Sequence, residues 1–187
     1  MAGLGSLSCG AWIGNVGLMT SAELLADGFG RIQQLVDHVL DGLGPQELQG
    51  RLDPSANTIG WLIWHLTRVQ DDHLAEVGGA EQVWTAQAWH ERFGLPFEAD
   101  ATGYGFSATQ VAQVQVSGEL LRQYHEAVYR RSVDYIATLT DKDLGRVVDT
   151  SWDPPVTLGA RLVSVLSDDL QHAGQAAFIR GVIERAG

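Results

Sequence analysis

The pattern of hydrophobic and polar positions along the chain predicts long amphipathic helices. In the first such segment apolar residues recur at steps of three and four, at Ile32, Leu35, Val36, Val39, Leu40 and Leu43. This is the period of a helix with one buried face. It predicts a first helix over residues 21–43, which Gly44 and Pro45 end.

The same period and capping signals predict three further helices, over about residues 57–77, 107–139 and 157–185. Ser55 or Asn57 caps the second helix, and Ser107 with Gln110 has the spacing of a capping box at the start of the third. Gly118 marks a bend in that long third helix. Four long helices with few strand signals indicate an all-α four-helix bundle.

The connections between the second and third helices and between the third and fourth are long. The first, over about residues 80–106, has room for a short helix near 81–92, and the second, over about 143–155, is expected to be a loop. A connection as long as the first is more often functional than idle. Both are long enough to allow helices that are not neighbours in sequence to pack together.

The first eighteen residues are expected to lie outside the fold. They are rich in glycine and carry no charged side chain, and they lack the positive start and solid apolar run of a secretory signal. Met19, which is followed by a helical pattern, is an alternative start. The sequence therefore predicts a tail over 1–18 and one bundle domain over 19–187.

Composition and charge narrow the classes of function. Hydrophobic residues make up 45% of the chain and charged residues 19%, enough for a folded core. The net charge of −11 disfavours nucleic-acid binding, because phosphate backbones are also negative. No apolar run reaches the roughly 18–20 residues of a membrane span. The single cysteine, Cys9, cannot form an internal disulfide, so the cytoplasm is expected.

The fourth predicted helix places two chemically active residues on its buried face. His172 and Asp168 are four residues apart and so share a face. The same face carries Val165, Ala176, Ile179 and Ile183. A charged carboxylate among apolar residues is costly unless it is paired or binds a cation. Asp169 points about 60° away and is the weaker candidate.

The second predicted helix turns His65 inward in the same way. That face also carries Thr58, Trp61, Leu62, Val69 and Asp72. Two imidazoles and one carboxylate suit a divalent transition metal, with zinc favoured and nickel, iron or manganese also compatible. From the spacing alone a purely structural interpretation is favoured, in which His172 hydrogen-bonds Asp168 and His65 is a satisfied core residue.

Two segments around these residues resemble the DinB/YfiT-like superfamily of metal-binding four-helix bundles. They read SANTIGWLIWHLTRVQDDH over residues 55–73 and VTLGARLVSVLSDDLQHAGQAAFIRG over residues 156–181. The intervening VWTAQAWHERFG, over 83–94, and TGYGFS, over 102–107, are similar to the actinobacterial branch that contains mycothiol-dependent transferases. The resemblance covers about residues 20–185.

The resemblance implies a metal held by His65, Asp168 and His172. Many members carry His where this chain has Asp168, and the mycothiol-dependent maleylpyruvate isomerases carry Glu. The implied activity is transfer of a low-molecular-weight thiol, mycothiol in this branch, to an electrophile, with the metal binding the thiol sulfur as a thiolate. A mycothiol-dependent isomerase and a stress-related metal-binding protein without turnover are the alternatives. A homodimer would be in keeping with the family.

Six further residues are candidates for binding substrate or the thiol. They are Trp61 and Trp89 as pocket walls, Asp72 and Gln175 as hydrogen-bonding groups, and Arg92 and Arg180 as partners for acidic groups. Each also has a structural interpretation, such as core packing for the tryptophans or an exposed salt bridge for Arg180.

Overall fold

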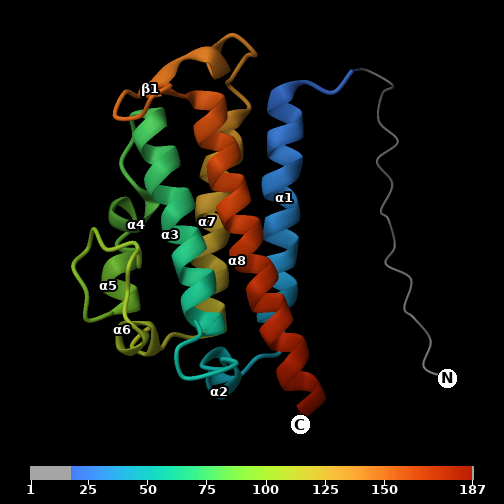
Figure 1. The fold of residues 1–187 in the computed structure, drawn as a ribbon, viewed down its shortest axis with the longest axis vertical. Coiled ribbons are helices and arrows are strands. Elements are labelled where there is room, and N and C mark those ends of the chain that lie inside the picture. The colour runs from blue at the N-terminus through green and yellow to red at the C-terminus, as the bar shows by residue number, and fades with distance from the viewer. Residues whose placement is uncertain (1–17, 187) are drawn as a thin grey trace, which may run out of the picture.

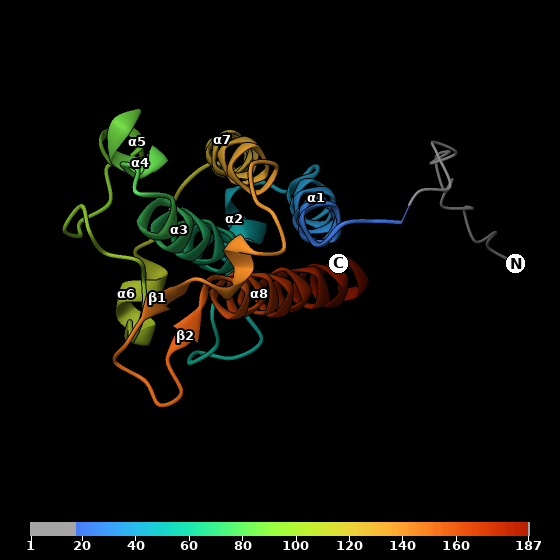
Figure 2. The ribbon, with the colours of Figure 1, turned by 90° about the horizontal axis from the view of Figure 1, so that it is seen from above.

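Four long helices form the body of the molecule in a computed structural model that describes residues 18–186 (Figure 1). They are α1 (Ser21–Leu40), α3 (Ile59–Gly78), α7 (Gly118–Ile136) and α8 (Leu158–Ala186). Helices α1 and α8 run in one direction and α3 and α7 in the other (Figure 1). Seen end-on, the helices occupy four corners, and α3 and α1 each contact both α7 and α8 (Figure 2). The predicted all-α four-helix bundle is confirmed.

Short elements fill the connections between the long helices. They are α2 (Pro45–Leu48), α4 (Val83–Ala86), α5 (Trp89–Phe93), α6 (Ala108–Ala112), a 3₁₀ turn η1 (Asp143–Gly145) and the strands β1 (Val147–Asp149) and β2 (Val156–Thr157). The two strands pair antiparallel and close over one end of the bundle (Figure 1). This hairpin lies where the sequence predicted only a loop. None of the helices described is long and apolar enough to cross a lipid bilayer.

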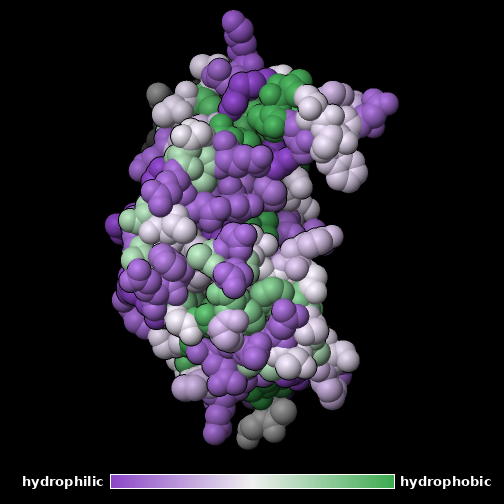
Figure 3. Space-filling model, turned by 90° about the vertical axis from the view of Figure 1, so that its left-hand side faces the viewer, coloured by the Kyte–Doolittle hydropathy of each residue, from purple (hydrophilic) through white to green (hydrophobic). Residues whose placement is uncertain are grey.

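The long connection before α7 packs its aromatic side chains inward, against α3 and α7. Trp84, Trp89 and Phe93 are buried. The face that carries α4, α5 and α6 shows mostly hydrophilic surface with small hydrophobic areas between (Figure 3). Two short helices lie here instead of the single one predicted near residues 81–92.

The predicted ends of the first two long helices need correction. The N-cap of α3 is Thr58, whose Oγ1 accepts the backbone N–H of Trp61 at 3.1 Å; neither Ser55 nor Asn57 has that position. Helix α1 ends at Leu40, and Gly42 then turns the chain with a φ of +71°. A left-handed backbone of this kind cannot continue a helix.

The predicted third helix is two helices. Ser107 and Gln110 form the expected capping box, but α6 ends at Ala112 and α7 has its own N-cap, Ser117. Between them Val114 is fully buried, and its carbonyl accepts from Gln49 Nε2 at 2.8 Å. Burial of this side chain and the long-range hydrogen bond outweigh helical continuity, so the chain breaks before Gly118 and does not bend there.

Candidate metal centre

The adjacent antiparallel helices α3 and α8 bring the three predicted ligands together. His65, Asp168 and His172 each offer one ligand atom, and these atoms lie within 4.8 Å of one another. The two imidazole rings are 4.9 Å apart between centroids, and Asp168 Oδ1 is 3.6 Å from His172 Nε2. Within residues 18–186 this is the only group of three or more such side chains found so close together.

The ring of His65 has a fixed orientation. Its Nδ1 lies 2.6 Å from the carbonyl oxygen of Thr102, so Nδ1–H donates and Nε2 keeps its lone pair. Burial lowers the pKa of His65, opposed by the Thr102 carbonyl. The ring is therefore neutral at pH 7, which is the form that binds metals.

His172 has the same arrangement with a side-chain acceptor. Its Nδ1 is 3.2 Å from Oε1 of Gln175, one helical turn further along α8. With Nδ1–H directed to Gln175, Nε2 faces Asp168. Gln175, predicted to contact substrate, thus lies against a candidate ligand. Hydrogen bonds of this kind from the outer nitrogen commonly orient histidine ligands in metal sites.

The donor set fits a divalent metal ion. Asp168 Oδ2 is buried and has no hydrogen-bond donor in the structure. A buried carboxylate oxygen without a partner is costly, and a cation shared with two imidazole nitrogens would satisfy it. Zinc accepts this set and in catalytic sites keeps one position open for a further ligand. The three residues are therefore compatible with a reactive metal centre.

Trp61 covers one side of the cluster. Its ring stacks on His65 with centroids 4.4 Å apart and planes 14° apart, and it meets the edge of His172 at 6.1 Å. The side chain is 6% exposed. Of the six residues predicted to bind substrate or thiol, Trp61 and Gln175 are the two that contact candidate ligands.

The other four have their contacts elsewhere in the structure. Asp72 accepts from Gln82, Trp89 packs on Tyr124, Arg92 lies over the Trp89 ring, and Arg180 donates to the carbonyls of His38 and Val39 and to Glu184. Arg180 therefore binds carbonyls at the C-terminal end of α1, a common use of arginine at a helix end. The geometry does not bring these side chains to the three candidate ligands.

Asp169, the weaker candidate, is fully buried in the bundle, and neither of its carboxylate oxygens has a partner. Burial, reinforced by the neighbouring charge of Asp168, raises the pKa of Asp169 well above its usual value. Burial thus disfavours the charged form of Asp169, and Asp168 is the carboxylate that faces the histidines.

Thr102 and Gly103 were not singled out as site residues from the sequence. Thr102 acts through its backbone carbonyl, which has no signature in the sequence. Gly103 has a φ of +93°, and a Cβ there would lie 2.8 Å from Trp64 Cζ3 and 3.1 Å from His65 Nδ1. The backbone passes against the site so closely that only glycine fits.

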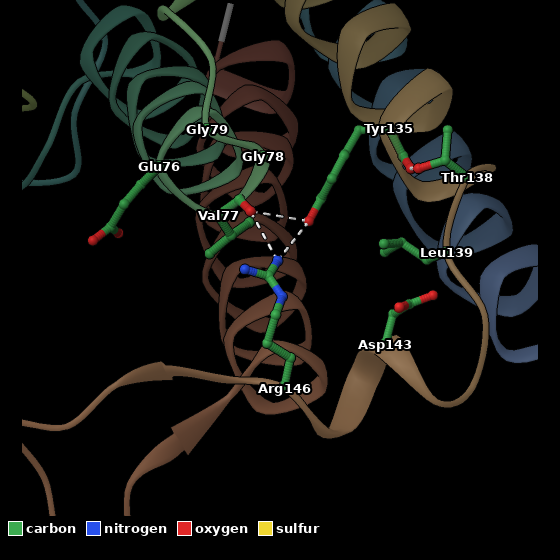
Figure 4. Close-up of a pocket in the computed structure, with 9 residues that line it drawn as sticks. All are labelled: Glu76, Val77, Gly78, Gly79, Tyr135, Thr138, Leu139, Asp143 and Arg146. Atoms are coloured by element: carbon green, nitrogen blue, oxygen red, sulfur yellow. Dashed lines mark hydrogen bonds between the residues drawn. The ribbon is translucent and has the colours of Figure 1, made fainter.

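One hollow lies away from the metal centre. It has a volume of about 480 Å³ and lies between the C-terminal ends of α3 and α7 and the η1 turn (Figure 4). Arg146 crosses it and donates to the carbonyl of Val77 at 2.9 Å and to Tyr135 Oη at 3.2 Å. Its lining includes none of the three candidate ligands.

Comparison with solved structures supports the DinB-like class. A conserved protein from Enterococcus faecalis is 27% identical, with a TM-score of 0.81 over 87% of this chain and 96% of that one. A DinB-like protein from Bacillus cereus ATCC 10987 is 18% identical, with a TM-score of 0.54 over 86% and 91%. No functionally curated protein matches the chain.

The fold and the cluster together define a DinB-like helical bundle with a candidate His₂Asp metal centre. A family model described as Mycothiol-S-transferase matches residues 25–185, which is most of the chain. The chain therefore belongs to the mycothiol S-transferase family, which confirms the resemblance on which the sequence analysis relied. Mycothiol as cosubstrate and an electrophile as acceptor follow from this family.

Proposed function

We propose that the chain transfers mycothiol to small electrophiles at a divalent metal, zinc being favoured, held by His65, Asp168 and His172. The observation that carries the proposal is the convergence of three ligand atoms within 4.8 Å between α3 and α8. A bound metal with an open position supplies a site where the thiol sulfur loses its proton at neutral pH.

The residues of the chain then have separate tasks. His65 and His172 present Nε2 because Nδ1 of each is engaged, by Thr102 and Gln175 respectively. Asp168 supplies the negative charge that makes a cation favourable. Trp61 excludes water from the side on which it stacks. In the net reaction the thiol sulfur forms a bond to the electrophilic carbon, the leaving group departs with its electron pair, and the thiol proton goes to solvent.

This chemistry needs no cysteine from the protein. The only one, Cys9, lies outside the described residues, and the thiol comes with the cosubstrate. A cytoplasmic location is part of the proposal, because a chain with one cysteine has no internal disulfide to maintain. The homodimer stays a prediction from the family resemblance.

Two measurements test the proposal together. Elemental analysis of the purified protein should find about one equivalent of a divalent metal, with zinc expected. Conjugation of mycothiol to monobromobimane should be fast with the metal, fall to the uncatalysed rate after chelation and return when the metal is added back.

Variants locate the activity within the chain. His65→Ala and His172→Ala should both lose the metal and the catalysed rate. His38→Ala, at an exposed histidine on α1, is the control and should keep both. Turnover that survives complete metal removal would reject the metal-dependent mechanism, and metal binding without turnover would favour a non-catalytic metal-binding protein.

A further inference from the structure

Helix α3 binds two consecutive carbonyls of the long connection through two of its own side chains. Nδ1 of His65 donates to the Thr102 carbonyl at 2.6 Å, and Nε of Arg68 donates to the Ala101 carbonyl at 3.2 Å. Arg68 lies about one helical turn beyond His65. The acceptor that orients His65 therefore belongs to the peptide group next to the one that Arg68 holds, and the two groups share the Cα of Thr102.

Arg68 is itself held by a buried polar network. The side chain is fully buried, and its Nη1 donates to Gln82 Oε1 at 2.8 Å and lies 3.8 Å from Asp71 Oδ2. Its guanidinium also stacks over Trp84, 4.8 Å from the ring centroid. A plane fixed on several sides in this way leaves the Nε–H pointing in one direction.

Asp71 links the same network to the start of the long connection between α3 and α7. Its carboxylate accepts the backbone N–H groups of Val83 and Trp84, each at 2.8 Å, and the hydroxyl of Tyr124 at 2.9 Å. Nε1 of Trp84 in turn donates to the carbonyl of Ala99 at 2.8 Å. Side-chain N–H groups thus hold the backbone segment that reaches the metal centre, at the carbonyls of Ala99, Ala101 and Thr102.

A buried arginine is a costly way to fill space. An ion pair taken out of water is often no more stable than apolar side chains of the same volume. Nη2 of Arg68 is buried without any partner in the structure, so the cost here is not fully recovered. An apolar residue could supply none of the polar contacts of Arg68, and among them the Nε–H contact with Ala101 is the one that reaches the backbone beside the metal centre.

We propose that Arg68 is a positioning residue for the metal centre, which fixes the Thr102 carbonyl through Ala101 and thereby sets the ring orientation of His65. This inference rests on the proposed function, because it concerns a metal bound at His65. In metal sites, loss of a group that orients a histidine ligand through its outer ring nitrogen typically lowers metal affinity about 10–100-fold. A fall in that range is expected without any change to the three ligands.

Arg68→Lys is the direct test. Lysine keeps a positive charge near Asp71 but lacks the planar fork and the Nε–H. The matched control is Gln70→Met, at another fully buried polar residue of α3. It removes the hydrogen bond from Gln70 Nε2 to Ser132 Oγ at 2.7 Å. Zinc affinity is measured by competition with a chelator, and thermal unfolding of the metal-free protein is measured in parallel.

The expected result for Arg68→Lys is a fall in zinc affinity of about tenfold or more. Gln70→Met should lose a comparable amount of thermal stability but keep a zinc affinity close to that of the wild type. Equal affinities in Arg68→Lys and the wild type would overturn the inference. So would losses of affinity that merely follow the losses of stability in both variants.

Two further measurements keep the test decisive. If Arg68→Lys fails to fold, the double variant Arg68→Met/Asp71→Asn removes both buried charges and leaves neither uncompensated; it should show the same loss of affinity. Nitrogen NMR of the metal-free protein should show His65 leaving its Nδ1–H form in either variant, and an unchanged signal would reject the inference. A wild type that binds no metal would instead overturn the proposed function.

Discussion

The imidazole of His65 and the backbone carbonyl of Thr102 form a hydrogen bond of 2.6 Å between residues 37 positions apart in the chain. It joins the middle of the bundle to the end of the long connection. Because the carbonyl can only accept, Nδ1 must carry the proton, and Nε2 is left for a metal. The connection is therefore part of the candidate metal centre.

This bond and the contact of His172 Nδ1 with Gln175 predict the tautomers of the two histidines before any metal is added. In metal-free protein at pH 7, both His65 and His172 should carry their proton on Nδ1, because Thr102 and Gln175 accept there. Long-range proton–nitrogen NMR correlation distinguishes the two nitrogens of each ring. Gln175→Ala should release the preference at His172 and leave His65 unchanged. Nε2–H forms at both rings in the wild type would contradict the geometry.

The neighbouring carboxylates Asp168 and Asp169 should respond oppositely to the same substitution. Asp168→Asn removes the charge beside His172 and should lower metal affinity by at least about tenfold. Asp169→Asn should leave the affinity nearly unchanged, because burial raises the pKa of Asp169 and its carboxylate is not among the three groups that converge. Chelator competition measures both affinities. If Asp169→Asn loses the metal and Asp168→Asn keeps it, the carboxylate ligand is Asp169 and the assignment to Asp168 is wrong.

Stability gives a second readout for the same pair. An acid whose pKa is raised by folding binds more protons in the folded state, so its contribution falls as the pH rises above the pKa of the unfolded chain. Asp169→Asn removes the titrating group and with it this loss of stability at higher pH. Metal-free Asp169→Asn should therefore unfold at a higher temperature than the wild type at pH 7, with the difference shrinking toward pH 4.

Trp61 should report metal binding by fluorescence. Its ring stacks 4.4 Å from that of His65, so a paramagnetic ion such as Co²⁺ at this histidine should quench its emission. Trp61→Phe should remove most of the quenching observed on titration. Trp152→Phe is the control, because that side chain lies in the β1–β2 connection and is 68% exposed; its quenching should match the wild type. Equal quenching in all three proteins would place the metal elsewhere.

His125 predicts how stability depends on pH. It is fully buried in α7, neither ring nitrogen has a partner, and burial lowers its pKa to about 4. Between pH 6.5 and pH 4 the unfolded chain binds a proton here that the folded chain does not, so stability falls as the pH falls. The full effect is about 3 kcal/mol.

Chemical denaturation at pH 7 and pH 4.5 measures this contribution in metal-free protein. His125→Leu should lose clearly less stability than the wild type over that interval. His38→Gln, at an exposed position on α1, should behave like the wild type. If His125→Leu and the wild type lose the same amount, His125 is not buried in its neutral form.

Because a helix has a regular period, the sequence could predict that His65, Asp168 and His172 come together. The spacing of four residues from Asp168 to His172 places both on one face, and the apolar neighbours predict that this face turns toward the core. In the structure the side chain of His172 is 18% exposed and that of Asp168 is 38% exposed. The same argument applies to His65 on α3. Side chains on long helices are therefore predictable in position even when the bundle topology is not known.

The groups that order the ligands are less predictable, since they depend on tertiary contacts. A carbonyl such as that of Thr102 is present in every residue and leaves no mark in the sequence. The break before α7 depends on burial of Val114 and its bond to Gln49, two segments far apart in the chain. From the sequence Arg180 is a candidate for contact with the thiol or for an exposed salt bridge. In the structure it pairs with Glu184 and donates to carbonyls of α1, and the helical period cannot reveal the contacts with α1.

The effect of a side chain at Gly103, beside the metal centre, can be compared with the effect of one at the neighbouring Gly105. Gly103 and Gly105 both have positive φ, +93° and +72°. A Cβ at Gly105 meets nothing within 4 Å, whereas one at Gly103 would lie 2.8 Å from Trp64 and 3.1 Å from His65 Nδ1. Both alanine variants bear the backbone strain, about 1–3 kcal/mol. Only Gly103→Ala also pushes on the ligand.

Gly103→Ala should therefore lower both the unfolding temperature and the metal affinity, and Gly105→Ala should lower the unfolding temperature alone. Thermal unfolding of the metal-free proteins and chelator competition measure the two quantities separately. The affinity difference is the informative one, because the strain common to both variants cancels in the comparison. If Gly103→Ala binds metal as tightly as Gly105→Ala, the backbone at Thr102 and Gly103 does not control the orientation of His65.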